Sequence, residues 1–275
     1  MSEETVKSLT QKLTRPGGAV AYEVAGDGPL IVCVPGMGEL RSSYRFVAPM
    51  LVAAGYRVAL TDLRGHGDSD AGFDTYGDEA TAGDVAALIG ELSGPAIIVG
   101  NSLAGGSAVL VAASRPDIVS GLVLVCPYVR DPSSSAFEQI IFRAMMAPWW
   151  ARAAWNFYLP KLYAGRKPAD FAQYRAAVRT AMKEPGHAKA FSLTARTRHD
   201  AAAAALSSVK APVLVIMGEL DPDFPKPAVE ANWIAEQVGG SVLMVAEAGH
   251  YPQAQRPELV VPAIEVFAKE LHRDA

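Results

Sequence analysis

Residues 95–106 read P-A-I-I-V-G-N-S-L-A-G-G, and this stretch contains the change of pattern that decides the fold. The run 96–99 is apolar and largely β-branched, which is typical of a buried strand in a parallel sheet. After Ser102 the apolar residues recur at helical spacing, so a helix follows the strand directly. Ser102 lies at the corner between them, and Gly100 and Ala104 give it the small-residue spacing of a G-x-S-x-G turn.

A serine on such a turn is predicted to be a nucleophile. The tight bend strains the backbone, and its hydroxyl projects at a helix N-terminus, where free N–H groups favour developing negative charge. Small neighbours are needed because the turn crowds strand and helix together. The alternative interpretation is a serine that only caps a helix, and the remaining motifs distinguish the two.

Composition favours a globular protein that acts on a small molecule. The chain has 275 residues, half of them apolar, which is enough to bury a large core in one or two domains. Its net charge of −4 and the absence of a basic stripe predict no binding to nucleic acid or to an anionic membrane. The polar N-terminus and the lack of a long apolar run predict a soluble, cytoplasmic protein. Cys33 and Cys126 are expected to be small buried hydrophobes, and the oligomeric state, monomer or homodimer, stays open.

Strand and helix patterns alternate along most of the chain. Strands are expected at residues 20–24, 30–34, 56–60, 96–99, 120–125, 212–217 and 241–245, the first of them at an edge of the sheet. Helices are expected at 46–54, 85–92, 102–113, 229–238 and 259–271, with the first becoming regular at Pro49. This alternation predicts an α/β fold, a mainly parallel twisted sheet flanked by helices on both faces.

Residues 127–210 break the alternation, since they contain helical patterns and no convincing strand. They predict an inserted α-helical cap between two halves of a core domain, residues 1–126 and 211–275. The first half of the insertion is dense in methionine and aromatic residues. Because ligand sites favour domain interfaces, four of these are assigned to an apolar substrate pocket: Met145, Trp149, Trp150 and Trp155.

A serine nucleophile needs a base, and the base needs an orienting acid. His250 follows the last predicted strand in A-G-H-Y-P, on a loop that can reach the same sheet edge as Ser102. The loop G-E-L-D-P-D-F-P after residues 212–217 supplies Asp221 as the acid, with Asp223 as the runner-up.

Other acids and bases fit less well. Glu219 and Asp131 are the further acid candidates, because each follows a predicted strand. His66 is the rival base, although its glycine neighbours suit a structural turn. The remaining histidines, His187, His199 and His272, are expected to be solvated or packed in cap or terminal helices.

An oxyanion must be met by preorganised hydrogen-bond donors. The backbone N–H of Leu103 directly follows the predicted nucleophile. The glycine-flanked Met37, on the loop after residues 30–34, is expected to aim its backbone N–H at the same point.

Several motifs in order, V-P-G-M-G, D-L-R-G-H-G-D-S, G-N-S-L-A-G-G, G-E-L-D and A-G-H, resemble those of the α/β-hydrolase superfamily. The resemblance runs from about residue 18 onward and is to the serine-nucleophile, esterase-like branch with a helical cap. It implies a Ser102–His250–Asp221 catalytic triad, an oxyanion hole from Met37 and Leu103, and no cofactor.

Two residues depart from the pattern of that family. Pro35 stands where many relatives have a histidine before the oxyanion glycine, and Ala104 replaces the last glycine of the elbow. Serine at the elbow argues against the haloalkane dehalogenase and epoxide hydrolase branches, which use aspartate there. The His, Cys and Asp spacing gives no support for a metal site, and no phosphate-binding or dinucleotide-binding motif is present.

The sequence therefore predicts a serine hydrolase that cleaves a carboxylic ester of a small, mostly apolar substrate through an acyl-enzyme. A carbon–carbon bond hydrolase of a ring-cleavage diketone, or a lactonase, is the first alternative, because the same machinery serves these reactions. A receptor-like protein that binds a ligand with little turnover is the second.

Overall fold

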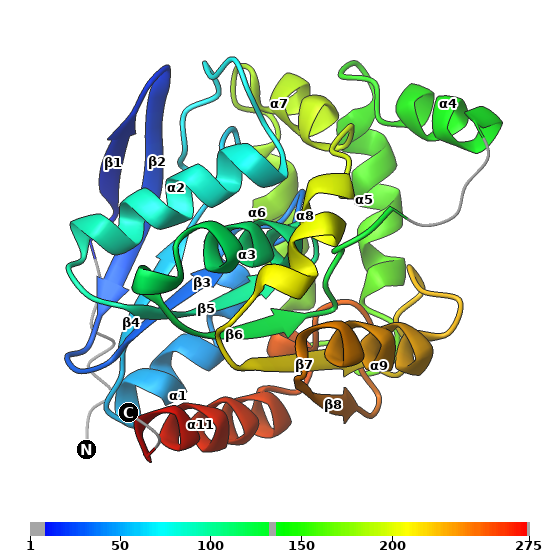
Figure 1. The fold of residues 1–275 in the computed structure, drawn as a ribbon. Helices are drawn as coiled ribbons and strands as arrows, with labels where there is room; N and C mark the ends of the chain where they lie inside the picture. Colours follow the sequence, from blue (N-terminus) through cyan, green and yellow to red (C-terminus); the bar gives the residue numbers. More distant parts are fainter. Residues whose placement is uncertain (1–8, 132–135, 274–275) are drawn as a thin grey trace.

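The computed structural model describes residues 9–131 and 136–273, without the side chains of residues 136–139, 143, 272 and 273. An eight-stranded sheet runs through its centre in the order β1-β2-β4-β3-β5-β6-β7-β8 (Figure 1). The strands are β1 Gln11–Arg15, β2 Gly18–Ala25, β3 Leu30–Val34, β4 Arg57–Thr61, β5 Ala96–Asn101, β6 Val119–Val125, β7 Val213–Gly218 and β8 Ser241–Val245. Only β1–β2 and β2–β4 pair antiparallel, so the predicted mainly parallel sheet is confirmed.

The edge of the sheet differs from the prediction. Residues 20–24 were expected to form an edge strand, but β2 lies second, covered by β1. The sequence of β1, Q-K-L-T-R, has three exposed and two half-buried residues and therefore no apolar alternation to reveal it. Polar and charged residues are common in an outermost strand, because they discourage its free backbone edge from pairing with another chain.

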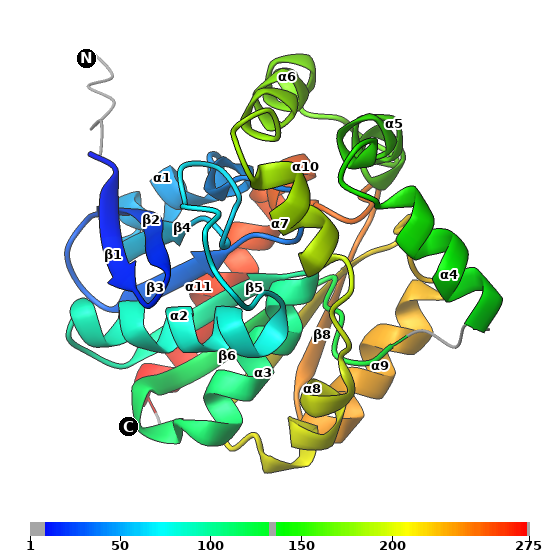
Figure 2. The ribbon, with the colours of Figure 1, turned by 90° about the horizontal axis from the view of Figure 1, so that it is seen from above.

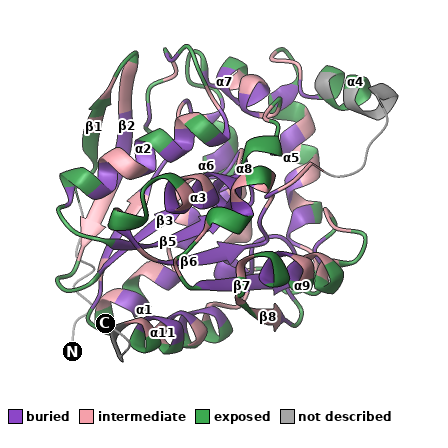
Figure 3. Cartoon of the chain, viewed as in Figure 1, coloured by how far each residue is buried: buried purple, intermediate pink, exposed green. Residues whose placement is uncertain are grey.

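Helices cover both faces of the sheet. On one face lie α1 Val47–Ala53 and α11 Pro257–Arg273, whose buried residues join the apolar cluster of that face. On the other lie α2 Asp78–Glu91, α3 Leu103–Ser114 and α9 Pro227–Val238. Figure 3 shows the central strands buried between these two layers. α1 becomes regular at Val47, two residues before the predicted Pro49, which the first turn of a helix tolerates.

The segment between β6 and β7 is helical in the part the structure describes. Its helices are α4 Ala136–Met145, α5 Ala151–Leu162, α6 Phe171–Ala181, α7 His187–Thr194 and α8 Asp200–Ala205. Figures 1 and 2 show α4 to α7 gathered on one side of the sheet edge, while α8 lies beside α3. A separate apolar cluster joins α5, α6 and α7 to Tyr251 on the loop after β8.

Short helical turns complete the chain. They are η1 Arg41–Tyr44, η2 Pro116–Ile118, η3 Leu206–Ser208 and α10 Pro252–Gln255. None of the described helices is both long and apolar enough to cross a membrane.

The parallel strands bring the predicted site residues to one edge. β3, β5, β7 and β8 are parallel members of the sheet, so their carboxyl ends lie on the same side. Met37, Ser102, Asp221 and His250 each follow one of these ends.

Candidate active site

Ser102 occupies the strained turn between β5 and α3. Its backbone has φ 58° and ψ −124°, an uncommon conformation for a residue with a side chain. The Ser102 N–H donates to the carbonyl of Val125 at 2.9 Å, which ties the turn to β6. A Cβ on Gly100 would lie 2.4 Å from the carbonyl oxygen of Ala104, so the crowding predicted for this turn is present. Ala104 itself is buried, and its methyl group is accommodated in the core.

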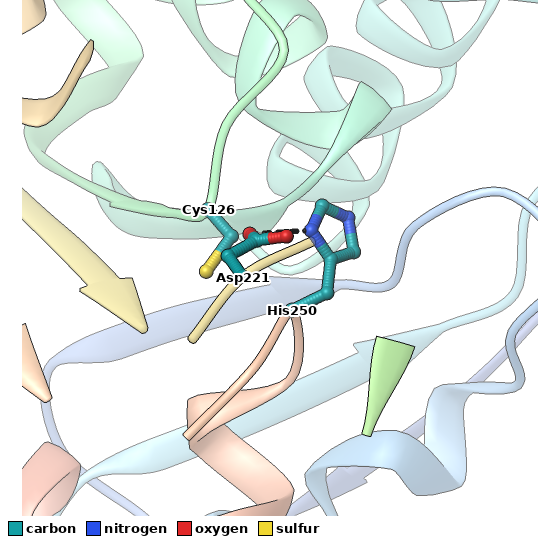
Figure 4. A group of neighbouring side chains, drawn as sticks. All are labelled: Cys126, Asp221 and His250. Carbon is teal, nitrogen blue, oxygen red and sulfur yellow. Dashed lines mark hydrogen bonds and ion pairs between the residues drawn. The ribbon is translucent and has the colours of Figure 1, made fainter. Parts of the chain in front are cut away.

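His250 and Asp221 form a hydrogen-bonded pair. The Nδ1 of His250 lies 2.7 Å from Oδ2 of Asp221, and both side chains are almost completely buried. Figure 4 shows the Asp221 carboxylate directed at the imidazole, with the Cys126 sulfur pointing away from the ring. Asp223 is the more distant of the two candidate acids, with its Oδ2 3.8 Å from the same nitrogen. Its backbone N–H donates to Oδ1 of Asp221 at 3.0 Å and fixes that carboxylate.

The charge of His250 is set by two opposing effects. Burial lowers its pKa, but the carboxylates of Asp221 and Asp223 outweigh burial, so the pKa is raised above its usual 6.5. Since Nδ1 faces Asp221, the ring's Nε2 is the nitrogen left for a substrate or for Ser102.

Buried polar contacts position the histidine loop. The side-chain amide of Asn101, the residue before Ser102, donates to the carbonyls of both Val125 and His250 at 3.0 and 3.1 Å. The backbone N–H of His250 donates to the carbonyl of Leu162 in α5 at 2.8 Å. Gln255 accepts from the N–H of Gly249 at 2.9 Å. Sequence reasoning missed Asn101 and Gln255, because an amide side chain carries no signal that distinguishes such a role.

The predicted oxyanion loop lies against the elbow. A Cβ on Gly36 would come within 2.7 Å of the Ser102 Cβ, so only glycine allows this approach. Trp155 donates from its indole nitrogen to the carbonyl of Gly38 at 2.9 Å, and Tyr174 accepts from the N–H of Leu40 at 3.2 Å. Residues of helices α5 and α6 therefore hold this loop, and their contacts do not require a histidine in place of Pro35.

The two proposed oxyanion donors have no protein partner among the described residues. Neither the Met37 N–H nor the Leu103 N–H donates a hydrogen bond there. Both residues line the same cavity as Ser102. Free N–H groups beside a serine hydroxyl are what a developing oxyanion requires.

A cavity of about 930 Å³ lies above the serine, between the sheet edge and α4, α5 and α7. Ser102 and His250 line it together with Trp155 and Met145, two of the four residues assigned to the pocket. Its wall also includes residues that were not assigned to the pocket from the sequence: Tyr128, Phe142, Met146, Phe157 and Tyr158.

The other two residues assigned to the pocket lie elsewhere. Trp149 and Trp150 are 79% and 50% exposed and do not line the cavity. Their rings pack edge to face at 6.1 Å, and the Trp150 indole donates to the carbonyl of Ala144. They precede α5, whereas Trp155 lies on the buried face of that helix.

His66 has the structural position that its glycine neighbours indicated. It is buried away from the cavity, its Nδ1 lies 2.9 Å from the carbonyl of Arg64, and burial lowers its pKa to about 4. The neighbouring Asp62 accepts from the backbone of Arg41 at 2.7 Å and of Asp68 at 3.1 Å. The D-L-R-G-H-G-D-S motif therefore organises a turn.

Of the remaining histidines whose side chains are described, only His199 lines the cavity. His187 is buried but does not line the cavity, and the His272 side chain lies outside the described residues. His199 corrects the expectation of a merely packed or solvated residue. It lines the cavity, and its Nδ1 lies 2.7 Å from Oδ2 of Asp78. Asp131, a candidate acid, accepts from the His199 backbone N–H at 3.1 Å and not from His250.

One group among the described residues has metal-ligand spacing: Cys126, Asp221 and His250, with ligand atoms within 4.8 Å of one another. Burial, followed by the Asp221 carboxylate, raises the pKa of the Cys126 thiol well above its usual range. This disfavours the thiolate that a metal ion needs. Nδ1 of His250 and Oδ2 of Asp221 are already hydrogen-bonded to each other, so the group is better explained as a histidine–carboxylate pair with a buried thiol beside it.

Comparison with known proteins extends over most of the chain. A model of the alpha/beta hydrolase family matches residues 31–263. A 2-(acetamidomethylene)succinate hydrolase of Mesorhizobium japonicum is 29% identical over 252 residues, covering 88% of each chain. A probable esterase of Oryza sativa subsp. japonica is 27% identical over 258 residues, covering 88% of this chain and 92% of the relative.

A solved structure agrees with the fold. The thermophilic esterase of Thermogutta terrifontis superposes with a TM-score of 0.80 at 25% identity, covering 96% of this chain and all of the esterase. The family match spans more than half of the sequence. The described fold superposes on that esterase over nearly its whole length. This chain therefore belongs to the alpha/beta hydrolase family.

Proposed function

We propose that this protein is a serine esterase that hydrolyses a carboxylic ester of a small, largely apolar substrate. The observation that carries the proposal is the cavity that Ser102 and His250 share. It is lined both by a strained serine and by a histidine whose other nitrogen lies 2.7 Å from Asp221. That set provides a nucleophile, a base and an orienting acid.

In the proposed acylation step, the Ser102 hydroxyl attacks the acyl carbon and passes its proton to Nε2 of His250. The backbone N–H groups of Met37 and Leu103 bind the oxyanion of the tetrahedral intermediate. His250 then gives the proton to the leaving alkoxide as the ester C–O bond breaks. Asp221 keeps the imidazole oriented and stabilises its positive charge.

Deacylation repeats these steps with water. His250 takes a proton from water, the resulting hydroxide attacks the acyl carbon, and the second tetrahedral intermediate releases Ser102 with the proton from His250. One ester and one water give one acid and one alcohol, and the enzyme is regenerated. We assign residues 127–210 the role of a cap over this reaction, because their helices supply Trp155, Met145 and most of the apolar wall.

The relatives support ester chemistry without fixing the substrate. Two carry the word esterase in their names, and the Mesorhizobium relative is a hydrolase of a succinate derivative. The apolar wall favours a substrate with a sizeable hydrocarbon part.

The test is hydrolysis of p-nitrophenyl esters of increasing acyl length by wild type and Ser102→Ala. We expect serine-dependent turnover with a chain-length optimum, and a loss of about 10³-fold or more in kcat for Ser102→Ala. Ser107→Ala is the matched control, because its hydroxyl is buried in α3 away from the cavity.

Three results would overturn the proposal. Wild-type rates in Ser102→Ala would remove the serine mechanism. Negligible ester turnover with rapid bleaching of a ring-cleavage dienoate, or rapid lactone opening, would replace ester hydrolysis by those reactions. Binding of a small apolar ligand by a folded protein without product release would favour the receptor alternative.

A further inference from the structure

A second histidine–carboxylate pair faces the cavity. His199, just before α8, places Nδ1 2.7 Å from Oδ2 of Asp78, the first residue of α2. The two residues are 121 positions apart in the sequence and come from the cap segment and the core. The proposed ester mechanism does not use this pair.

Three contacts fix the orientation of His199. Its backbone N–H donates to Asp131 at 3.1 Å, its Nδ1 faces Asp78, and its ring stacks on Tyr128 at 5.6 Å and 21°. The side chain keeps 11% of its surface exposed, and it lines the cavity. Since Nδ1 is occupied, Nε2 is the ring atom available to a bound molecule.

Packing alone does not explain the pair. Burial raises the pKa of Asp78, and its Oδ1 has no hydrogen-bond partner among the described residues. Burying a carboxylate beside an apolar cavity costs free energy unless a partner or a function compensates for it. In the described part of the chain, no carboxylate is hydrogen-bonded to the ring of the buried His66 or His187, and neither histidine lines the cavity.

The charges around His199 favour an anion. Lys161, Arg196 and Arg198 also line the cavity. Arg198 is neutralised by Asp131 and Asp200 at 3.4 and 2.7 Å, but among the residues that the structure describes neither Lys161 nor Arg196 has a carboxylate partner.

The acids of the cavity are already engaged. Asp131 accepts from His199 and pairs with Arg198, and Asp223 accepts from the Tyr158 hydroxyl. The chain as a whole carries a net charge of −4, so this positive lining is a local feature and does not reflect the composition.

We propose that His199, oriented by Asp78, forms a carboxylate-binding subsite, and that the substrate is an ester with a free carboxylate apart from the scissile bond. This rests on the proposed esterase function. With Nδ1 held at Asp78, the imidazole donates from Nε2 to the substrate carboxylate, and Lys161 and Arg196 add attraction at the same cavity. The apolar wall takes the hydrocarbon between the two groups.

The experiment compares matched esters that differ in one carboxylate. For the acyl side, the pair is the p-nitrophenyl monoester of adipic acid and p-nitrophenyl hexanoate. For the alcohol side, the pair is p-carboxyphenyl hexanoate and phenyl hexanoate. We expect wild type to prefer the acidic member of at least one pair in kcat/KM, and His199→Phe to reduce that preference roughly 10- to 100-fold.

Phenylalanine keeps the stacking on Tyr128 but removes the hydrogen bond. His199→Gln keeps a hydrogen-bond donor near the Nε2 position and is expected to retain part of the preference. If His199→Phe does not fold, His199→Gln still tests the subsite. His187→Phe makes the same change at a buried cap histidine away from the cavity and is expected to retain the preference.

The outcomes separate this proposal from the esterase function. Turnover that needs Ser102 but shows no acidic preference, or a preference unchanged in both His199 variants, overturns the subsite alone. Turnover that persists in Ser102→Ala overturns the esterase mechanism on which the subsite rests.

Discussion

Asp223 is the residue whose charge can be removed without dismantling the His250–Asp221 pair. Its carboxylate lies 3.8 Å from Nδ1 of His250 and raises the pKa of that histidine. A general base works only when it is unprotonated, so rate falls as the pH drops through this pKa. We expect the acid limb of kcat/KM to lie above 6.5 in wild type and to move to lower pH by about one unit in Asp223→Asn.

Asparagine preserves the shape of the side chain and an oxygen that accepts from the Tyr158 hydroxyl. Glu219→Gln is the control, because Glu219 is on the same loop but is exposed and outside the cavity. An acid limb that stays in place in Asp223→Asn, or that moves equally in Glu219→Gln, would contradict the assigned electrostatics.

The candidate site residues that directly follow a strand could be predicted from the sequence. The apolar runs before Ser102, Asp221 and His250 identify parallel strands, and carboxyl ends of parallel strands share an edge. The contact between His199 and Asp78 was not predictable, because these residues are 121 positions apart and their contact depends on how the segment between β6 and β7 packs on α2.

At the level of elements, helix α5 packs against the loop that carries Met37, the proposed oxyanion donor. Gly38 has φ +75°, and a Cβ there would lie 2.3 Å from the Trp155 ring, whose nitrogen donates to the Gly38 carbonyl. We expect Gly38→Ala to displace the loop and to lower kcat about 10²-fold or more, with a smaller change in KM, since oxyanion contacts form mainly in the transition state. Kinetics on the best p-nitrophenyl ester measure both constants.

Gly90→Ala is the matched control for that substitution. Gly90 lies in α2, its φ is ordinary, and nothing lies within 4 Å of the added Cβ. Alanine there is expected to leave kcat unchanged and to raise the free energy of unfolding by about 0.5–1 kcal/mol. Equal loss of activity in the two variants would show that the Gly38 effect is not specific to the loop.

Elements with an apolar face were predictable and those without one were not. β8 was expected at residues 241–245 and occupies them, because its residues are uniformly apolar after Ser241. β1 was missed because it is polar and its only pairing in the sheet is with β2. The orientation of α5 was also beyond the pattern, since aromatic residues occur both before the helix and on its buried face.

At the scale of the whole molecule, a buried carboxyl joins the core to the helical insertion. Glu39 follows Gly38, is fully buried, and accepts from Tyr174 at 2.7 Å and from Tyr163 at 3.3 Å. Its Oε1 has no hydrogen-bond partner among the described residues. Arg45 connects the same regions from outside, through Asp170 at 2.6 Å and the face of the Tyr174 ring.

The burial of Glu39 makes the stability of the protein depend on pH. Burial raises the pKa of Glu39 from 4.5 to about 8, although the two tyrosine hydrogen bonds oppose this. Between these values the unfolded chain releases a proton that the folded protein retains. Stability therefore falls as pH rises through the window, by at most ~1.4 kcal/mol for each pH unit.

Glu39→Gln removes this titration while keeping an oxygen for Tyr174. We expect the variant to gain stability relative to wild type as pH rises from about 5 to about 9, with the gain levelling off above the folded pKa. Urea unfolding of both proteins across that range measures the difference, which cancels contributions from other groups such as His250. Glu91→Gln, at an exposed position, is expected to show no such trend. A Glu39→Gln difference that is constant with pH would mean that Glu39 titrates alike in the folded and unfolded chains. Its contacts with Tyr163 and Tyr174 would then not depend on a retained proton.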